Sequence, residues 1–529
     1  MADPDVAPVL VSLRLGRRVG TAGRRLFGSF VEHLGRGVYG GLYAPDEPTA
    51  SPDGFRTDVL ALVRELGVTT VRYPGGNFVS GYDWRDGVGP RERRPRRLDL
   101  AWKTVEPNTF GTDEFVAWCR EADVEPMLAL NLGLGDTRDA LALLEYTNHP
   151  GGTALSDERA ANGSPEPHDV RLWCLGNEAD GPWQLGHRSA ADYAEKAAIT
   201  ASAMRRFDQT LELVVVGSSN DRMPTFGAWE REVLTRTIDL VDHLSCHIYF
   251  YDQGDRAQFL RSADRLDAFL EDVAATIAHV KATTRSTRDV RISLDEWNVW
   301  DFTSYDDLEP HRVFEEAPRI LEQEYTLADA VVVGTLLQSI LRHADVVAIA
   351  ALAQLVNVIG PIRAEPGRPA WRQTTFHPFA AVARSAGHTV VDTVAASGSA
   401  DASADVTAVV TLSPDSPAAT DPAADPAADP AADPAADPHA LVHVANRSTT
   451  TPAHVRLDLH ELAPTGVDRA ELLWAPDPGA TNTVDDPDLV VPQPLDARLV
   501  DGHLVLDLPP VSWATVRVAR RIAPRTEEG

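Results

Sequence analysis

Short apolar, β-branched runs alternate with amphipathic stretches through the first two thirds of the chain. Helices are predicted between the runs from amphipathic stretches at 54–66, 113–122, 190–207, 229–238, 261–284 and 325–343. A doubly wound open sheet is the alternative, but no glycine-rich phosphate-binding loop follows the first run. Eight strand–helix units instead predict an α/β fold, a (β/α)8 TIM barrel over residues 21–380. The eight runs are 26–32, 69–74, 126–132, 170–178, 213–218, 241–249, 290–297 and 346–355.

From about residue 385 the apolar positions alternate with period two. Pro, Gly and Asp separate short runs of this kind, which predicts a C-terminal antiparallel β-sandwich, jelly-roll-like, over residues 381–529. Residues 1–20 hold strand-like sequence that we expect to join this sandwich. The tetrapeptide Asp-Pro-Ala-Ala is repeated four times from Asp421. Because proline lacks a backbone N–H, the segment near 415–439 is predicted to be a disordered insert.

Net charge, apolar content and cysteine content limit the kinds of partner that this chain can bind and the compartment in which it is expected. The formal charge of −29 argues against nucleic acid or an anionic membrane as partner. No apolar run is long enough to span a bilayer and the acidic N-terminus does not resemble a secretory signal, so a cytoplasmic protein is expected. Three cysteines form no disulfide framework, and without CxxC or HExxH motifs neither a metal nor a cofactor is expected.

Polar residues stand at the same end of several predicted strands, where barrel active sites lie. Glu178 and Glu296 are the outstanding pair, and both have tryptophans nearby in sequence. Two carboxyl groups across a barrel mouth predict a glycosidase: one protonates the leaving oxygen, and the other attacks the anomeric carbon or activates water. The other strand-end residues are Glu32, Asn77, Asn177, His247, Tyr249, Asp295, Gln354 and Asn357.

Some of these residues have structural alternatives. Asn77 could hold a left-handed turn after Gly75 and Gly76. His247 is expected to be a supporting or core histidine, and Arg72 either pairs with a carboxylate inside the barrel or orients Glu296.

Long motifs at 28–41, 72–84, 173–183, 295–300 and 353–358 resemble glycoside hydrolase family 51, the α-L-arabinofuranosidases of the retaining (β/α)8 clan. The resemblance implies an exo-acting enzyme that releases terminal non-reducing arabinofuranose from arabinan or arabinoxylan oligosaccharides by double displacement. It further implies a homo-oligomer, a hexamer. A β-xylosidase or endoglucanase on the same barrel is the alternative, and a non-catalytic carbohydrate-binding protein is disfavoured because both glutamates are present.

The resemblance also implies roles for individual residues. Glu178 is expected to be the general acid/base and Glu296 the nucleophile. Asn177 is expected to contact the sugar 2-hydroxyl, and Tyr249 to position the nucleophile. The remaining substrate-binding residues implied are Glu32, Asn77 and Gln354 for sugar hydroxyls, and Trp102 and Trp300 as platforms for the leaving group.

Overall fold

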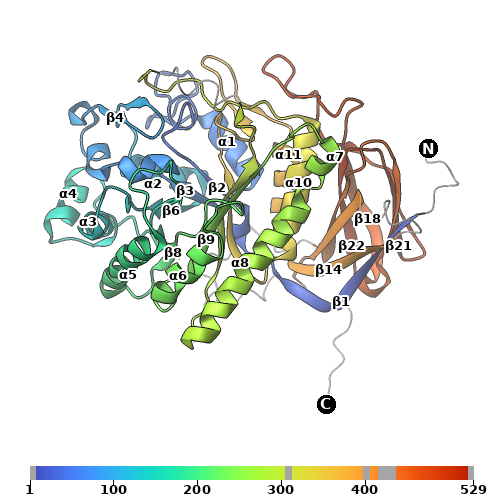
Figure 1. Cartoon of the computed structure of the whole chain (residues 1–529). Helices are drawn as coiled ribbons and strands as arrows, with labels where there is room; N and C mark the ends of the chain where they lie inside the picture. The colour runs from blue at the N-terminus through green and yellow to red at the C-terminus, as the bar shows by residue number, and fades with distance from the viewer. Residues whose placement is uncertain (1–7, 304–312, 397–404, 415–436, 522–529) are drawn as a thin grey trace.

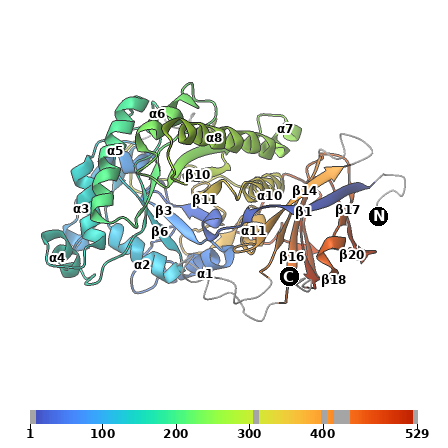
Figure 2. The same cartoon turned by 90° about the horizontal axis from the view of Figure 1, so that it is seen from below.

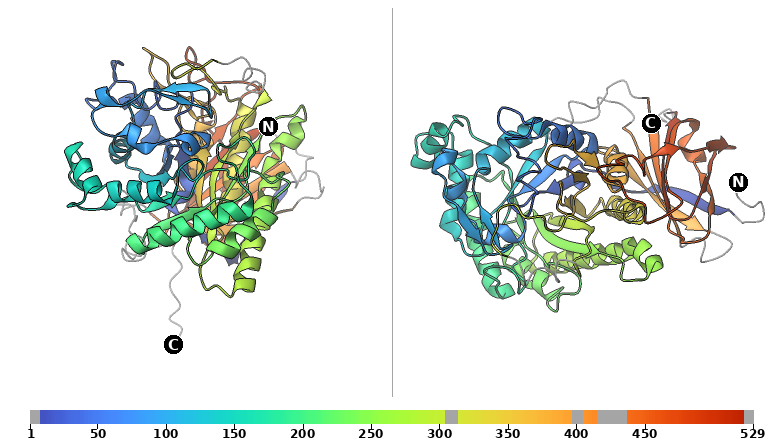
Figure 3. Two further views of the ribbon diagram at one scale, coloured as in Figure 1. Left: turned by 60° about the vertical axis from the view of Figure 1, so that its left-hand side comes forward. Right: turned by 90° about the horizontal axis from the view of Figure 1, so that it is seen from above.

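The computed structural model describes residues 8–303, 313–396, 405–414 and 437–521. Two bodies lie side by side, a barrel ringed by helices and a strongly curled sheet (Figure 1). Views from a second side and from above show the same arrangement, with the sheet attached to one flank of the barrel (Figure 3). Residues 415–436, which hold the Asp-Pro-Ala-Ala repeats, lie outside the described ranges.

The barrel consists of eight strands that pair in parallel in the closed order β10-β11-β2-β3-β6-β7-β8-β9, with register shifts in β10. This confirms the predicted TIM barrel, and the open-sheet alternative is wrong. Inside the barrel, Met127, Leu172, Val214 and Ile349 pack together as a buried cluster. The strands are β2 (Gly28–Phe30), β3 (Thr70–Tyr73), β6 (Glu125–Ala129), β7 (Leu172–Cys174), β8 (Glu212–Val215), β9 (His243–Phe250), β10 (Arg291–Val299) and β11 (Val347–Ala353).

Amphipathic helices cover the outside of the barrel. Helix α1 (Thr57–Leu66), for example, buries one apolar stripe and ends at Gly67, whose φ of +79° suits glycine. The other helices at predicted positions are α2 (Thr112–Ala122), α5 (Ala190–Phe207), α6 (Ala228–Thr237), α8 (Ser262–Thr284) and α10 (Leu327–Arg342). The hydrophobic pattern did not predict four further helices, α3 (Thr137–Asn148), α4 (Ala154–Ala161), α7 (Arg256–Leu260) and α11 (Phe376–Ala383). None of the described helices has both the length and the apolar character needed to cross a bilayer.

Loops at the carboxyl ends of the strands carry short elements of their own. After β3 the chain forms the 3-10 turns η2 (Asn77–Gly81), η3 (Trp84–Gly87) and η4 (Arg91–Arg93). A small hairpin, β4 (Arg97–Asp99) and β5 (Thr104–Glu106), follows. The remaining short elements are η1 (Arg24–Phe27) before β2, and β12 (Ile362–Arg363) paired with β13 (Trp371–Arg372).

The second body is a ten-stranded sheet in the order β19-β18-β22-β16-β15-β14-β1-β17-β21-β20. It curls around a core of aliphatic side chains that includes Val11, Val442, Leu457, Leu506 and Val516. The strands are β1 (Val9–Thr21), β14 (Thr389–Ala396), β15 (Val406–Leu412), β16 (His439–Asn446), β17 (Ala453–Asp458), β18 (Pro464–Leu473), β19 (Gln493–Pro494), β20 (Ala497–Val500), β21 (His503–Leu508) and β22 (Ser512–Arg520).

Strand β1 comes from the opposite end of the sequence and lies inside this sheet (Figure 2). It pairs antiparallel with β14 on one side and parallel with β17 on the other. The sheet is therefore mixed, where the alternating pattern predicted antiparallel pairing throughout.

Helix α10 joins the two bodies. All of its residues from Leu327 to Leu341 are buried, because one side faces the barrel and the other faces the sheet. The Trp513 ring of β22 lies directly on Gly334, where a Cβ would come within 2.5 Å of the ring. Gln338 donates its side-chain N–H to the His443 carbonyl of β16 at 3.0 Å. These contacts fix the sheet against the flank of the barrel.

Candidate active site

The two glutamates singled out by the sequence face each other at the carboxyl ends of β7 and β10. Glu178 lies in the turn after β7 with a φ of +38°, and Glu296 lies within β10. Both are buried, with 8% and 5% of their surface exposed. One carboxylate oxygen from each lies within 4.8 Å of the other, together with a nitrogen of His247. Retaining glycosidases hold their two carboxyl groups about 5–5.5 Å apart, and inverting ones hold them farther apart.

Glu296 is held by two hydrogen-bond donors. Arg72 donates from Nη1 to Oε1 at 2.8 Å, and the Tyr249 hydroxyl donates to Oε2 at 2.8 Å. Burial raises the pKa of Glu296, while the positive charges of His247 and Arg72 oppose that rise. Arg72 also lies 3.7 Å from Asp295, so both expectations for this arginine are met: it pairs with a buried carboxylate and it contacts Glu296.

Glu178 is held by two different donors. The indole Nε1 of Trp183 donates to Oε2 at 2.7 Å, and Nδ1 of His247 lies 2.9 Å from Oε1. The other ring nitrogen of His247 lies 3.1 Å from Asp295. Burial by itself lowers the pKa of His247, but Glu296, Asp295 and Glu178 outweigh burial and raise that pKa well above its ordinary value. An ionised carboxylate at each ring nitrogen favours the imidazolium form of His247, which donates through both nitrogens.

The sequence predicts no role for Trp183, and it predicts a supporting or core position for His247. The signal for Trp183 was the Gly181-Pro182 turn, which brings a residue five positions after Glu178 back onto it. The Glu178 carbonyl accepts the Gly181 N–H at 2.9 Å, which closes this turn. His247 does support the site, but it does so in direct contact with the paired glutamates.

A second group of predicted residues surrounds Glu32, just after β2. Its Oε1 accepts hydrogen bonds from the Phe78 N–H at 2.8 Å and from the Trp102 indole at 2.7 Å. Its Oε2 lies 3.3 Å from Nε2 of Gln354, which follows β11. Burial raises the pKa of Glu32 to about 8, even though the two N–H donors act to lower it. The negative charge of Glu296 contributes to the same rise in the pKa of Glu32.

Two glycines let the chain pass close to Glu32. A Cβ on Gly75, whose φ is +129°, would overlap the Glu32 side chain, and a Cβ on Gly76 would lie 2.7 Å from Oε2. Asn77 follows at the start of η2 without a positive φ, so the alternative that it holds a left-handed turn is wrong. Its side chain is half-buried and makes no hydrogen bond to another described residue, which leaves the amide open to a ligand.

The remaining predicted residues adjoin the two glutamates. Oδ1 of Asn177 accepts a hydrogen bond from Nη2 of Arg72 at 2.6 Å, so this arginine links Asn177 to Glu296. The half-buried Trp300 packs edge-on against Tyr249, with ring centroids 5.1 Å apart. Oε1 of Gln354 is buried without a partner among the described residues. An unpaired buried acceptor of this kind is costly, and a substrate hydroxyl would satisfy it.

Two groups of side chains within the described residues have the spacing of metal ligands. The first is Glu178, His247 and Glu296. A protonated His247 already donates to carboxylates through both nitrogens, so this group favours proton transfer over metal binding. The second is Asp458, His460 and His503 in the curled sheet.

Comparison with known proteins assigns the chain to a family. Residues 62–271 match the α-L-arabinofuranosidase 1 domain, and residues 295–512 match the α-L-arabinofuranosidase C-terminal domain. An intracellular exo-α-(1→5)-L-arabinofuranosidase of Streptomyces lividans is 48% identical over 95% of this chain and 74% of its own length. The chain belongs to the family 51 α-L-arabinofuranosidases.

Other relatives agree with that membership. An exo-α-(1→6)-L-arabinofuranosidase of Bifidobacterium longum is 47% identical, over 93% of this chain and 94% of its own. A solved family 51 α-L-arabinofuranosidase, also from Bifidobacterium longum, superposes with a TM-score of 0.87 at 42% identity and covers 98% of this chain and 100% of that one. The family resemblance and the glycoside hydrolase class predicted from sequence are both confirmed.

Proposed function

We propose that this family 51 enzyme acts on the non-reducing ends of its substrates and cleaves terminal α-L-arabinofuranosyl residues with retention of configuration. The observation that carries the proposal is the separation of the two buried carboxylates, whose nearest oxygens lie within 4.8 Å. That gap suits direct attack on the sugar, because an inverting site needs room for a water molecule between sugar and base.

In the first step Glu296 attacks the anomeric carbon and the bond to the leaving group breaks. Glu178 transfers its proton to the departing oxygen, which leaves an arabinofuranosyl ester on Glu296. Arg72 and Tyr249 each donate to a different oxygen of Glu296 and so hold the carboxylate in position. As Glu178 becomes negative, the Trp183 N–H and the His247 imidazolium stabilise the new charge.

In the second step Glu178 acts as the base. It takes a proton from water, the water oxygen attacks the anomeric carbon, and the ester bond to Glu296 breaks. Two inversions at the same carbon give net retention.

The polar groups around the two glutamates suit the hydroxyls of one furanose ring. Asn177 adjoins Glu178 in sequence and suits the 2-hydroxyl, while Glu32, Asn77 and Gln354 suit the others. At neutral pH a Glu32 with a pKa near 8 is largely protonated, so its carboxyl can also donate a hydrogen bond. Trp102 and Trp300 stand as platforms for the leaving part of the substrate.

The names of the relatives support two possible linkages in the substrate. The Streptomyces lividans relative is named for α-(1→5) and one Bifidobacterium longum relative for α-(1→6), at almost equal identity. We therefore propose arabinan or arabinoxylan oligosaccharides with either linkage as substrates. Relatives named intracellular support action inside the cell, and the family resemblance supports a hexamer.

The experiment that tests the proposal combines two variants with product analysis. Glu296→Ala should abolish release of p-nitrophenol from the aryl α-L-arabinofuranoside. Glu178→Ala should be rescued by azide and give a glycosyl azide of retained configuration, because the nucleophile remains. Near-wild-type turnover by Glu296→Ala would contradict the assignment of Glu296 as the nucleophile.

Two further measurements test stereochemistry and specificity. Proton NMR of the wild-type reaction should show the α-anomer of arabinose forming first; the β-anomer would overturn retention. Parallel assays on aryl β-xylosides and on cellulose should give little activity, and preference for either would favour the alternative substrates.

A further inference from the structure

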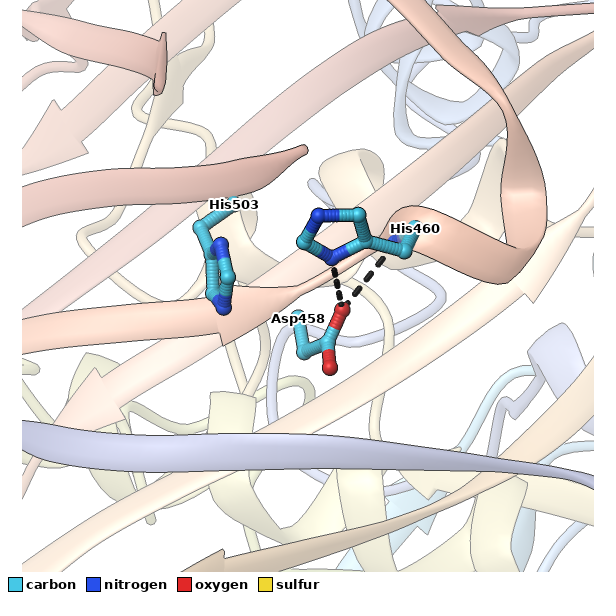
Figure 4. Close-up of side chains that lie close together, drawn as sticks. All are labelled: Asp458, His460 and His503. Atoms are coloured by element: carbon cyan, nitrogen blue, oxygen red, sulfur yellow. Dashed lines mark hydrogen bonds and ion pairs between the residues drawn. The ribbon is translucent and has the colours of Figure 1, made fainter. Parts of the chain in front are cut away.

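Three side chains converge at one place on the curled sheet, away from the catalytic glutamates. Asp458 ends β17, His460 lies in the following 3-10 turn η6 (His460–Leu462), and His503 begins β21 (Figure 4). One carboxylate oxygen and one nitrogen from each ring lie within 4.8 Å of one another. None of the three residues takes part in the proposed hydrolysis.

Strand pairing brings Asp458 and His503 together. They lie directly opposite each other in the antiparallel pair β17–β21. Because the next residue, Leu459, donates its N–H to the Gly502 carbonyl at 3.0 Å, Asp458 and His503 form a non-hydrogen-bonded pair, in which side chains are closest. Their neighbours Leu457 and Leu504 are buried in the sheet core, so Asp458 and His503 point to the opposite, outer side.

The third side chain is held over this pair. Both the backbone N–H and the ring Nδ1 of His460 donate to Oδ1 of Asp458, at 3.0 and 2.7 Å. The His460 ring lies over Gly502, where a Cβ would come within 2.6 Å of ring atoms. Asp501 and Gly502, with φ of +45° and +72°, form the tight turn between β20 and β21. The backbone thus fixes all three positions before any ligand binds.

We propose that Asp458, His460 and His503 bind one divalent transition-metal ion, with Zn²⁺ as the best match. Two imidazoles and one carboxylate suit zinc, whereas Ca²⁺ and Mg²⁺ prefer sets made of oxygen ligands. The ion takes the place of the hydrogen between Asp458 and the His460 ring, and water completes the coordination.

The required movement is small. Metal–ligand bonds of about 2.0–2.1 Å in a tetrahedral site place donor atoms roughly 3.3 Å apart. The side chains of His460 and Asp458 are 55% and 49% exposed, so solvent leaves them room to rotate toward that spacing. Arg456 opposes binding, because its Nη2 lies 3.2 Å from Nδ1 of His503.

Such an ion would stabilise the edge of the sheet. It would link η6, which follows β17, to the hairpin of β20 and β21, and β20 is the last strand of the sheet on this side. The expected effect is on stability and not on hydrolysis.

The test measures Zn²⁺ binding to the full chain, free of any histidine tag, by isothermal titration calorimetry with zinc chloride. The wild type should bind one equivalent, and His460→Ala and His503→Ala should each weaken binding at least tenfold. His454→Ala is the matched control. His454 lies on the same strand as Asp458 and pairs with Asp507 at 2.7 Å, but it is not in the three-residue cluster, so its loss should leave the affinity unchanged.

Stability and activity complete the test. Saturating Zn²⁺ should raise the melting temperature of the wild type and of His454→Ala, but not of the other two variants. Activity on the aryl arabinofuranoside should be unchanged in all variants, which shows that they fold. Absence of binding by the wild type would overturn the proposal, as would equal affinity in His460→Ala and His503→Ala.

Discussion

The two carboxylates that we propose as catalytic are held by chemically different donors. Glu296 accepts from a guanidinium and a phenol, whereas Glu178 accepts from an indole and faces an imidazolium. Permanent charge beside Glu296 favours the ionised form that a nucleophile needs. The hydrogen bonds that Glu178 accepts are strongest after that residue has given up its proton. The same barrel mouth therefore supports two unlike tasks for two identical side chains.

Replacing Tyr249 with Phe should lower kcat by roughly 10- to 100-fold, because a hydrogen bond to a charged group contributes about 1.5–3 kcal/mol. The phenyl ring keeps the edge-on contact with Trp300. Steady-state kinetics on the aryl arabinofuranoside would measure the change. Tyr251→Phe is the control, because Tyr251 packs on Phe302 without touching either glutamate, and it should retain wild-type kcat. Equal kcat for Tyr249→Phe and the wild type would show that the Tyr249 hydroxyl is not needed to position Glu296.

Glu32 should make stability depend on pH. Its pKa is about 8 in the folded protein and ordinarily 4.5, so folding favours the protonated form. The stability it contributes is complete below about pH 4.5 and is lost as the pH rises toward 8. Glu32→Gln keeps an acceptor for Phe78 and Trp102 but cannot ionise.

Melting temperatures measured from pH 5 to 8 check this prediction. The wild type should lose stability relative to Glu32→Gln across that window, so the two curves should approach or cross as the pH rises. Parallel curves would mean that Glu32 is already ionised at pH 5.

Among the elements, α10 has the most constrained surface, because it is buried against both bodies. Gly334→Ala should lower the melting temperature, although alanine favours helix by about 1 kcal/mol over glycine. The reason is that the new methyl group would meet the Trp513 ring at 2.5 Å in a packed interior. Thermal unfolding followed by circular dichroism measures the effect.

A double-mutant cycle separates this clash from a general effect on the helix. Trp513→Phe alone should destabilise by removing buried surface. The double variant with Gly334→Ala should lose less free energy of unfolding than the two single variants lose together. The reason is that the smaller Phe ring leaves room for the new methyl group. If the stability losses of the two substitutions simply add, the effect of Gly334→Ala does not come from a clash with Trp513 but from elsewhere in α10.

The barrel strands, and the residues that gather at the candidate site, could be predicted from the sequence because both depend on local pattern. Parallel strands that are buried on two faces have continuous apolar sequences. Polar residues at their carboxyl ends, such as Glu32 and Glu178, must lie together at one end of the barrel. The contacts of Trp183 and His247 were not predictable in this way. They depend on the path of one turn after β7 and on how far His247 reaches across from β9.

The missed helices have a similar explanation. Helices α3 and α4 carry few strongly apolar residues, so their periodicity is weak. Their caps were the better signal: Asp136 and Thr153 each accept a backbone N–H at the first turn. Nothing local could reveal that β1 pairs with β17, because pairing between distant segments leaves no periodic mark in either.

At the scale of the whole molecule, β1 holds the curled sheet together. It is the only connection between β14 and β17 in the strand order of the described sheet. A chain beginning at Ala22 should therefore expose two unpaired strand edges and the apolar core, and should aggregate although every barrel strand remains. Soluble yield and size-exclusion chromatography measure the outcome.

A chain beginning at Pro8 is the matched control, because it keeps all of β1. It should be soluble and active. If the chain beginning at Ala22 were equally soluble and active, β1 would be dispensable and the sheet would hold through its remaining pairs.

The position of β1 also sets an order of events during synthesis. Its residues leave the ribosome long before those of its partners, which begin at Thr389 and Ala453. At about 5–20 residues per second, β1 waits roughly 20–70 s for β14 and longer for β17. The barrel can assemble during that interval, while Val9 and Val11 have no sheet to enter. A strand made before the whole barrel is thus among the last to be placed, and a factor that shields it would act while the barrel is still being synthesised.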